Sequence, residues 1–367
     1  MKPLGIYIHV PFCDGKCYYC DFYSKKENEY TINLYVQKLI SDLKNQSPNF
    51  KDYYIDTIYF GGGTPSLLGS KNLSSILNTM KSCYNLKRPE ITLEANPTKA
   101  NTLDFELLRN SGFNRLSIGL QSALNSELKL LGRRHTASNA QSTISIAKSA
   151  GFDNISLDLM IAIPNQTEES LKTSIDFCLS QNISHISAYI LKIEEGTVFY
   201  KKRNSLCLPN DDKTSELYLF TVAELEKAGF NQYEISNFSK KGKESIHNLK
   251  YWNTDEYLGF GPSAHSFINN KRFYFKRSLK SYLDNNEPIA DGSGGSIEEY
   301  AMLRLRLKQG LIEKDFYEKF KMHIPKQFYE NADKLKTTGL VKVENDSISL
   351  STNGFLVSNE LISRIIL

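Results

Sequence analysis

Between residue 4 and about residue 236, short apolar runs alternate with longer segments whose apolar residues recur at the spacing of an amphipathic helix. The short runs predict β-strands at residues 4–10, 57–60, 90–94, 115–120, 155–160 and 185–191. The longer segments predict helices at residues 30–44, 70–83, 103–110, 137–149, 168–180 and 214–227. A helix after every strand is typical of parallel βα units.

Glycines past three of the predicted helices support this alternation. The helices that end at residues 110, 149 and 227 are followed by Gly-Phe pairs that begin at Gly112, Gly151 and Gly229. A glycine just past a helix permits a left-handed cap, after which the chain turns into the next strand. Repeated βα units predict an α/β fold, a full or partial (β/α) barrel over residues 1–236. The alternative is a doubly wound open sheet, but its usual G-x-G-x-x-G fingerprint is absent after the first strand.

The alternation of strands and helices ends after residue 236, and the remaining sequence predicts two further parts. Residues 237–290 form an aromatic- and glycine-rich extension, and Asp-Gly-Ser-Gly-Gly at residues 291–295 predicts a flexible joint. Residues 291–367 predict a small C-terminal domain that is winged-helix-like. Its elements are three helices and a hairpin, at residues 297–308, 313–320, 326–337, 340–343 and 347–350. Duplex DNA binding is one function of that shape, but the presumed recognition helix lacks a cluster of Arg and Lys, so we expect a packing or partner-binding module.

Three of the six cysteines lie close together after the first predicted strand. Cys13, Cys17 and Cys20 are spaced C-x3-C-x2-C, and the position two residues further on is Phe22. Three thiolates on a short loop can hold three irons of a [4Fe–4S] cubane and leave the fourth iron open. At this spacing, the small chelating ligand that we expect on the open iron is S-adenosylmethionine (SAM), whose reductive cleavage starts radical chemistry.

Two other uses of these cysteines fit the sequence less well. A structural zinc site needs four closed ligands, commonly in two separated pairs, and no second pair follows. His9 precedes the triplet, but strand alternation points it away from the loop that begins at Cys13. A disulfide framework does not fit so few cysteines in so long a chain. Cys83, Cys178 and Cys207 are scattered and are interpreted as ordinary thiols.

Composition and charge restrict the partners and the cellular location that we expect. The net charge of +4 is too slight to indicate nucleic acid as a partner. No stretch approaches the roughly 18 apolar residues of a membrane span. The first apolar run is short and is interrupted by Pro11, so it does not predict a signal peptide. We expect a cytoplasmic, reducing location, which an oxygen-sensitive cluster requires.

Polar residues recur where the predicted strands end. The second strand is followed by Gly-Gly-Gly-Thr-Pro at residues 61–65, and Glu94, Gln121 and Asp158 lie near the ends of the next three strands. In a parallel barrel these ends line the active-site mouth. One such residue is usually a satisfied polar group, but three on successive strands indicate a ligand site. Their chemistry suits a cationic sulfonium that carries ribose hydroxyls and an amino-acid head.

Several motifs in order resemble a known family. They are Tyr7-x-His9-x-Pro11-Phe12-Cys13-x3-Cys17-x2-Cys20, Gly61-Gly62-Gly63-Thr64-Pro65, Gly119-Leu120-Gln121-Ser122, Leu131-Gly132-Arg133-Arg134-His135 and Leu157-Asp158-Leu159-Met160. Together they are similar to the radical-SAM family of oxygen-independent coproporphyrinogen III oxidases and the related HemW-type haem chaperones. The resemblance implies that the three cysteines hold the [4Fe–4S] cluster. It implies SAM contacts at Tyr7, Gly62, Gly63, Thr64 and Glu94, and it matches the oxidases' second SAM site to Tyr19, Gln121, Arg133 and Asp158.

Within this family, three features favour the chaperone branch. The oxidases carry a fourth cysteine where this chain has Phe22, and they carry an additional segment ahead of the cysteines. His247-Asn248-Leu249-Lys250-Tyr251-Trp252 matches the H-N-x-x-Y-W motif of the chaperones. The resemblance therefore implies a protein that binds haem and a SAM-ligated cluster and passes haem to an acceptor protein, such as a membrane-associated haem enzyme. The alternative is a radical enzyme that decarboxylates coproporphyrinogen III or modifies another porphyrin, so enzymatic activity is left open.

The H-N-x-x-Y-W motif has two interpretations. The resemblance implicates it in haem binding, with His247 as an axial ligand and Tyr251 and Trp252 packed on the porphyrin. Alternatively, the two aromatic residues anchor a loop to the barrel and His247 only forms hydrogen bonds. His265 is a second candidate near the SAM or haem site. One departure from the family is Ala162, where Gly-Leu-Pro is usual, and we expect alanine there to tighten the loop.

Overall fold

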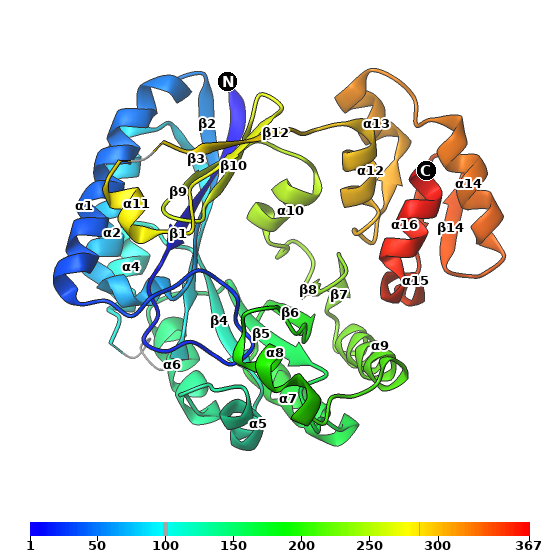
Figure 1. The fold of residues 1–367 in the computed structure, drawn as a ribbon, viewed down its shortest axis with the longest axis horizontal. Coiled ribbons are helices and arrows are strands. Elements are labelled where there is room, and N and C mark those ends of the chain that lie inside the picture. Colours follow the sequence, from blue (N-terminus) through cyan, green and yellow to red (C-terminus); the bar gives the residue numbers. More distant parts are fainter. Residues whose placement is uncertain (98–101, 286) are drawn as a thin grey trace.

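The computed structural model describes residues 1–97, 102–285 and 287–367. Its centre is a strongly curved sheet with helices around its outer face (Figure 1). Six neighbouring strands of this sheet run parallel and follow the order of the sequence. They are β1 (Lys2–Val10), β2 (Tyr53–Gly62), β3 (Leu86–Ala95), β4 (Arg115–Gln121), β5 (Ile155–Ile161) and β6 (His185–Ile190). Every strand predicted for the barrel is confirmed, with some of them a few residues longer.

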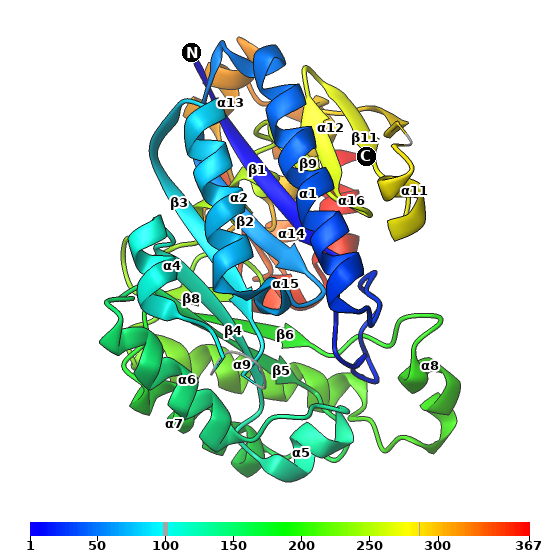
Figure 2. The same ribbon diagram turned by 90° about the vertical axis from the view of Figure 1, so that its left-hand side faces the viewer.

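The predicted helices cover the outer face of these strands (Figure 2). They are α1 (Glu29–Gln46), α2 (Gly69–Cys83), α4 (Phe105–Ser111), α6 (Ala137–Ser149), α7 (Glu168–Ser180) and α9 (Asp211–Lys227). A doubly wound sheet reverses its strand order and carries helices on both faces, whereas the order from β1 to β6 never reverses. The barrel prediction is therefore confirmed and the doubly wound alternative is wrong. The barrel is partial, because the edge strands β7 (Asn231–Gln232) and β12 (Ile289–Ser293) are not paired with each other.

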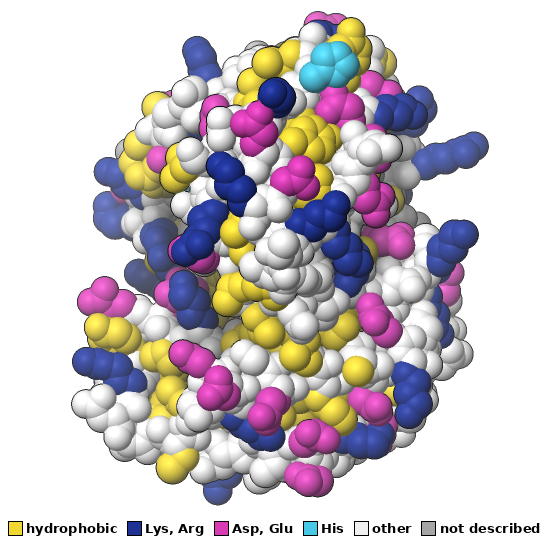
Figure 3. All heavy atoms as spheres, turned by 90° about the vertical axis from the view of Figure 1, so that its right-hand side faces the viewer, with side chains coloured by type: hydrophobic (Ala, Val, Ile, Leu, Met, Phe, Trp, Pro, Cys, Tyr) yellow, Lys and Arg dark blue, Asp and Glu magenta, His cyan; other side chains and the backbone are white. Residues whose placement is uncertain are grey.

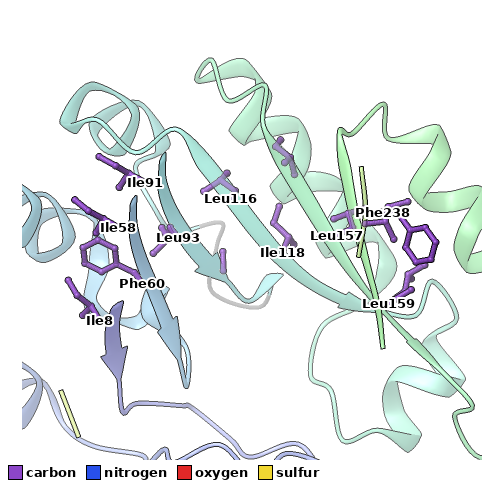
Figure 4. Packing of buried hydrophobic residues seen from close by; sticks show 14 of the residues in the cluster. Ile8, Ile58, Phe60, Ile91, Leu93, Leu116, Ile118, Leu157, Leu159 and Phe238 are labelled. Atoms are coloured by element: carbon purple, nitrogen blue, oxygen red, sulfur yellow. The ribbon is translucent and has the colours of Figure 1, made fainter. Parts of the chain in front are cut away.

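Side chains alternate between the two faces of each parallel strand. Apolar residues such as Ile8, Phe60 and Leu93 belong to the buried hydrophobic cluster that joins the strands to the helices (Figure 4). The alternate, inward residues are polar in several strands, as Arg115 and Ser117 show in β4. A parallel sheet with a core on both faces would be apolar on both. The polar inner rows therefore leave the interior of the barrel available to a ligand.

Residues after α9 extend the sheet at both edges. The added strands are β7 and β8 (Asn237–Ser239) beside β6, and β9 (Tyr257–Phe260), β10 (His265–Ile268), β11 (Lys271–Tyr274) and β12 beside β1. β9 runs parallel to β1, and β10 to β12 are antiparallel. The predicted flexible joint is wrong in its first half, because residues 291–293 belong to β12. Their ladder with β11 makes this glycine-containing stretch an edge strand.

Two short helices accompany these strands. α10 (Ile246–Trp252) lies on the inner side of the curved sheet and packs against β2 (Figure 1). α11 (Leu279–Leu283) packs against α1 on the outside. The remaining connections carry η1 (Ser47–Phe50), η2 (Pro65–Leu68), α5 (Asn125–Leu130), α8 (Val198–Lys202) and η3 (Arg203–Ser205). Within the described residues, no helix combines the length and hydrophobicity that a membrane span requires.

The C-terminal unit has the winged-helix order of elements. It comprises α12 (Ile297–Arg304), β13 (Leu311–Ile312), α13 (Glu313–Phe320), α14 (Lys326–Lys336), β14 (Val341–Glu344) and β15 (Ser347–Leu350), followed by α15 (Thr352–Leu356) and α16 (Ser358–Ile366). The three strands form an antiparallel sheet in the order β13-β15-β14. α14, in the position of a recognition helix, carries Glu330 and Asp333 between its lysines. On this side of the molecule basic and acidic side chains are interspersed (Figure 3), a pattern that does not favour a phosphate backbone.

Candidate functional site

The cysteine loop leaves the carboxyl end of β1 and is fixed by backbone hydrogen bonds to distant segments. Cys13 N donates to Lys25 O at 2.9 Å, which closes the base of the loop. Tyr18 N donates to Leu131 O at 3.0 Å, which joins the loop to the segment after α5. Such external support holds ligand residues in place before a cofactor binds.

The three thiols line one cavity at the carboxyl ends of the strands. Cys13, Cys17 and Cys20 are all free. Burial raises the pKa of both the Cys17 and the Cys20 thiol, so the thiolates depend on a bound metal for their charge. In the described part of the chain, no three His, Cys, Asp or Glu side chains form a ligand set for a single metal ion. Three thiols on one loop suit a cubane with an open iron, whereas a structural zinc site needs four closed ligands.

Two glycines let the end of β2 lie close to the cysteine loop. Gly62 has a φ of +106°, and a Cβ there would lie 2.7 Å from the His9 ring. A Cβ on Gly63 would lie 2.4 Å from the backbone oxygen of Phe12, the residue before Cys13. Both positions therefore need glycine because of the chain beside them, independently of any ligand.

Glu94 projects from the end of β3 into the cavity wall. Its Oε1 accepts a hydrogen bond from the Tyr59 hydroxyl at 2.8 Å, and its Oε2 accepts one from Gly62 N at 3.2 Å. Burial raises the pKa of Glu94 to about 7, and the Tyr59 hydrogen bond only partly offsets this. A carboxyl group poised near neutral pH ionises readily when a cation binds beside it. SAM offers such cations in its sulfonium and ammonium groups.

A second set of polar residues occupies the wall formed by β4, β5 and the segment after α5. Arg133 donates from Nε and Nη2 to the Tyr19 hydroxyl, at 3.1 and 2.7 Å. Asp158 accepts a hydrogen bond from the Ser117 hydroxyl at 3.1 Å, and burial raises the pKa of Asp158 to about 6. Gln121 has a φ of +70°, a left-handed conformation that strains a non-glycine residue and is often found at functional sites.

The departure at Ala162 has a local explanation. Ala162 adopts a φ of +62°, in the region that glycine favours. The Gln166 side chain supports this turn, because its Oε1 accepts from Ala162 N at 2.7 Å and its Nε2 donates to Met160 O at 3.3 Å. A left-handed alanine costs about 1–2 kcal/mol. Alanine therefore strains the turn, but the turn still has the backbone conformation expected of a glycine.

The cavity has a volume of about 340 Å³ and lies between the cysteine loop and the inner face of the barrel. It is lined by most of the residues predicted for the site, namely Cys13, Cys17, Tyr19, Cys20, Gly62, Gly63, Thr64, Glu94, Gln121, Arg133 and Asp158. Among the lining residues that were missed are Arg115, Ser117, Ser187, Tyr189 and Asn248. Of these five, all but Asn248 occupy alternate positions along β4 and β6, so the polar alternation within each strand was the signal that could have found them.

Tyr7 and His247 lie in a buried aromatic cluster and do not line the cavity. The Tyr7 hydroxyl lies 3.1 Å from His9 Nδ1. Both nitrogens of His247 are engaged, Nδ1 with the Thr57 hydroxyl at 2.8 Å and Nε2 with the Tyr251 hydroxyl at 2.9 Å. Burial lowers the pKa of His247 to about 3, so the ring is neutral. Such an imidazole has no nitrogen left for iron, and a ligand role would require α10 to leave this position.

The His247–Trp252 motif forms a helix that is anchored at both ends, and it is not a loop. His247 N donates to Glu90 Oε1 at 3.1 Å, so a carboxylate from β3 meets the amino end of α10. Lys250 Nζ lies 2.7 Å from Asp56 Oδ2, and its side chain is almost fully buried. Within this motif, Asn248 is the residue that reaches the cavity.

His265 lies outside the cavity lining as well. It begins β10, is exposed, and stacks on Tyr274 with 5.2 Å between the ring centroids. His265 therefore does not line the cavity, although it lies within electrostatic range of His9, whose ring contacts Tyr23 O of the cluster loop.

Three cysteines after the first strand of a partial (β/α) barrel face glycines and carboxylates at the ends of the following strands, around one cavity. This combination of fold and site defines the radical-SAM class of proteins.

Comparison with known proteins supports the radical-SAM class and identifies a family within it. The sequence model of the radical SAM superfamily matches residues 7–178. The haem chaperone HemW of Lactococcus lactis is 34% identical over 377 residues, which cover 100% of this chain and 98% of the relative. HemW of Bacillus subtilis is 35% identical over 375 residues, 97% of each chain. The structure of Escherichia coli coproporphyrinogen III oxidase HemN has a TM-score of 0.84 and 21% identity, and the match covers 100% of this chain and 90% of that one. The chain belongs to the HemW family of radical-SAM proteins.

Membership of the superfamily implies a [4Fe–4S] cluster and SAM, and the residues present fit both. The three free thiols on one supported loop offer ligands for three irons. The position two residues after Cys20 is Phe22, so no fourth thiol follows on this loop. Glu94 and the glycine-rich end of β2 lie in the wall of the same cavity. The donor set therefore suits a cluster with one open iron and a cationic ligand beside it.

Proposed function

We propose that this chain is a haem chaperone that carries a SAM-ligated [4Fe–4S] cluster, binds haem and transfers it to an acceptor protein. The observation that carries the proposal is the full-length similarity to HemW proteins, which extends beyond the radical-SAM part of the chain. The similarity to HemN is one of fold. The proposed acceptor is a haem enzyme, including one that is membrane-associated.

In this proposal Cys13, Cys17 and Cys20 hold three irons of the cluster. When bound, the cluster and SAM supply one-electron chemistry. Glu94 offers a carboxylate to the cationic part of SAM, while the glycine-rich end of β2 lines the same cavity. Burial of Glu94 strengthens each of its polar contacts.

The wall made by Tyr19, Gln121, Arg133 and Asp158 is the proposed place for a second SAM or another polar ligand. Arg133 is held by Tyr19, and Asp158 is held by Ser117. These contacts orient a cation and a carboxylate side by side before a ligand arrives, which lowers the cost of binding.

Haem is proposed to bind at the mouth of this cavity. Phe22 and Tyr189 both line the cavity, yet they remain 61% and 42% exposed. Exposed aromatic side chains around a cavity indicate a binding surface, and a flat porphyrin packs well on aromatic rings. Lys16, also in the lining, offers a cation to a propionate. Haem at the mouth would keep one edge open to an acceptor.

Two measurements on the anaerobically reconstituted protein test the proposal. Haem titration followed by absorbance should give one haem per chain. Phe22→Ser should weaken binding, whereas Tyr317→Ser, at an exposed tyrosine of α13 in the C-terminal unit, should not. Incubation with SAM, a reductant and coproporphyrinogen III should give no protoporphyrinogen. Steady protoporphyrinogen formation would replace the chaperone function by that of an oxidase.

A further inference from the structure

Arg115 is a buried cation that forms no direct ion pair with a described residue. It is 2% exposed and begins β4, with its side chain in the lining of the cavity. Its Nε is buried and has no hydrogen-bond partner. Among the described residues, no carboxylate forms an ion pair with its guanidinium. Arginine stays charged at any physiological pH, and an unpaired buried charge is costly.

The polar groups within electrostatic range of this guanidinium already form hydrogen bonds with other residues. Glu94 accepts hydrogen bonds from Tyr59 and Gly62, and Asp158 accepts one from Ser117. The rings of His185 and His247, which also lie within range of the charge, are each hydrogen-bonded at both nitrogens. Burial lowers the pKa of both histidines, so they are neutral. The guanidinium therefore has donors to spare, and Glu94 and Asp158 act on it only through space, without a direct ion pair.

The position of Arg115 places this cation far from the cluster loop. Inward residues of β4 are Arg115, Ser117, Gly119 and Gln121, and all four line the cavity. A strand rises about 3.3 Å per residue, so Arg115 and Gln121 are roughly 20 Å apart along β4. Because the cysteine loop lies at the carboxyl end of the strands, Arg115 forms the floor of the cavity and the cluster loop forms its mouth.

We propose that Arg115 recognises a ligand carboxylate at the floor of the cavity. The planar fork of a guanidinium matches a carboxylate with two parallel hydrogen bonds. A ligand carboxylate that reaches this floor also neutralises the buried charge of Arg115. Charge compensation therefore contributes to ligand binding.

Two ligands of this protein class carry such a carboxylate. One source is a propionate of a haem that enters the cavity beyond its mouth, and this assignment rests on the proposed function. The other is the amino-acid carboxylate of a second SAM molecule, because the SAM that chelates the open iron lies at the cluster loop; this source rests only on membership of the radical-SAM class. Esterified and decarboxylated analogues separate the two, because each removes the carboxylate and leaves the rest of the ligand intact.

The test compares wild type with Arg115→Met, Arg115→Lys and the surface control Arg364→Met, all reconstituted anaerobically. Binding is measured for haem, haem dimethyl ester, SAM and decarboxylated SAM. For the ligand that reaches the floor, Arg115→Met should weaken binding roughly 30-fold or more, and Arg115→Lys should weaken it less. The corresponding analogue should bind all four proteins equally. If wild type binds no haem, the proposed function fails while the SAM pair still reports on Arg115.

Three results would overturn the proposal. Arg115→Met could bind haem and SAM as wild type does, which would show that no ligand uses the guanidinium. It could weaken each ligand and its analogue equally, which would show a merely structural role. Finally, an unpaired cation should leave the ligand-free Arg115→Met protein at least as stable as wild type. A fall in Tm of more than about 5 °C would show that Arg115 is paired within the protein.

Discussion

Replacing His247 with alanine distinguishes a supporting residue from a haem ligand. In the structure the imidazole bridges the Thr57 and Tyr251 hydroxyls, at 2.8 and 2.9 Å, and it is 1% exposed. It also stacks on Tyr59 with 5.1 Å between ring centroids. His247→Ala removes all three contacts at once.

The cost follows from those contacts. Each buried hydroxyl left without its partner costs about 1–3 kcal/mol. Loss of the ring contact and the void left behind add to this. We expect His247→Ala to lower the free energy of unfolding by about 3–5 kcal/mol. His247→Gln, which keeps one of the two hydrogen bonds, should cost about half as much.

The assay is urea unfolding of the cluster-free protein, followed by far-ultraviolet circular dichroism, together with haem titration below the unfolding transition. His247→Ala should lose stability yet keep the haem spectrum of wild type. Asn248→Ala, on the same helix but facing the cavity, is the matched control and should cost clearly less. A stability within about 1 kcal/mol of wild type, together with an altered haem spectrum, would refute the assignment of His247 as a buried support.

Three further predictions concern the cluster and the cavity. Burial raises the pKa of Glu94 from 4.5 to about 7, so the folded chain binds this proton more tightly than the unfolded chain. Stability should therefore fall as pH rises from about 4.5 to about 7, by about 3 kcal/mol. Glu94→Gln should remove most of that fall between pH 5 and pH 8, and an unchanged pH dependence would contradict the cause given. Cys17→Ser should sharply lower iron and sulfide per chain after reconstitution, whereas Cys83→Ser should leave both unchanged. Gly63→Ala should also lower the iron content, because its Cβ would meet the Phe12 oxygen at 2.4 Å; full iron loading in that variant would show that the loop can shift at no cost.

The barrel could be predicted because its signals are local. Apolar spacing sets each strand and helix, and Gly112, Gly151 and Gly229 all have the positive φ that a helix cap needs. The cluster loop was equally accessible, since the spacing of its cysteines is a local property. The short strands beside β1 were missed because β9 to β12 are four or five residues long, and such short runs give no reliable period.

The position of the His247–Trp252 motif could not be predicted in the same way. Its helix is seven residues long, too short for a clear helical pattern, and its place depends on partners far away in sequence. Glu90 on β3 meets its amino end, and Thr57 on β2 engages its histidine. Arg115 was missed for a different reason, because a polar residue at the start of a strand is usually exposed. Here Arg115 is only 2% exposed, because it faces the inside of the curved sheet.

The central claim is that the chain hands haem to another protein. Haem-loaded protein, freed of excess haem by gel filtration, is mixed with increasing concentrations of a haem-free acceptor, and the transfer rate is followed by absorbance under anaerobic conditions. Direct transfer predicts a rate that rises with acceptor concentration. A rate that stays constant, equal to the spontaneous loss of haem to solution, would contradict the chaperone function.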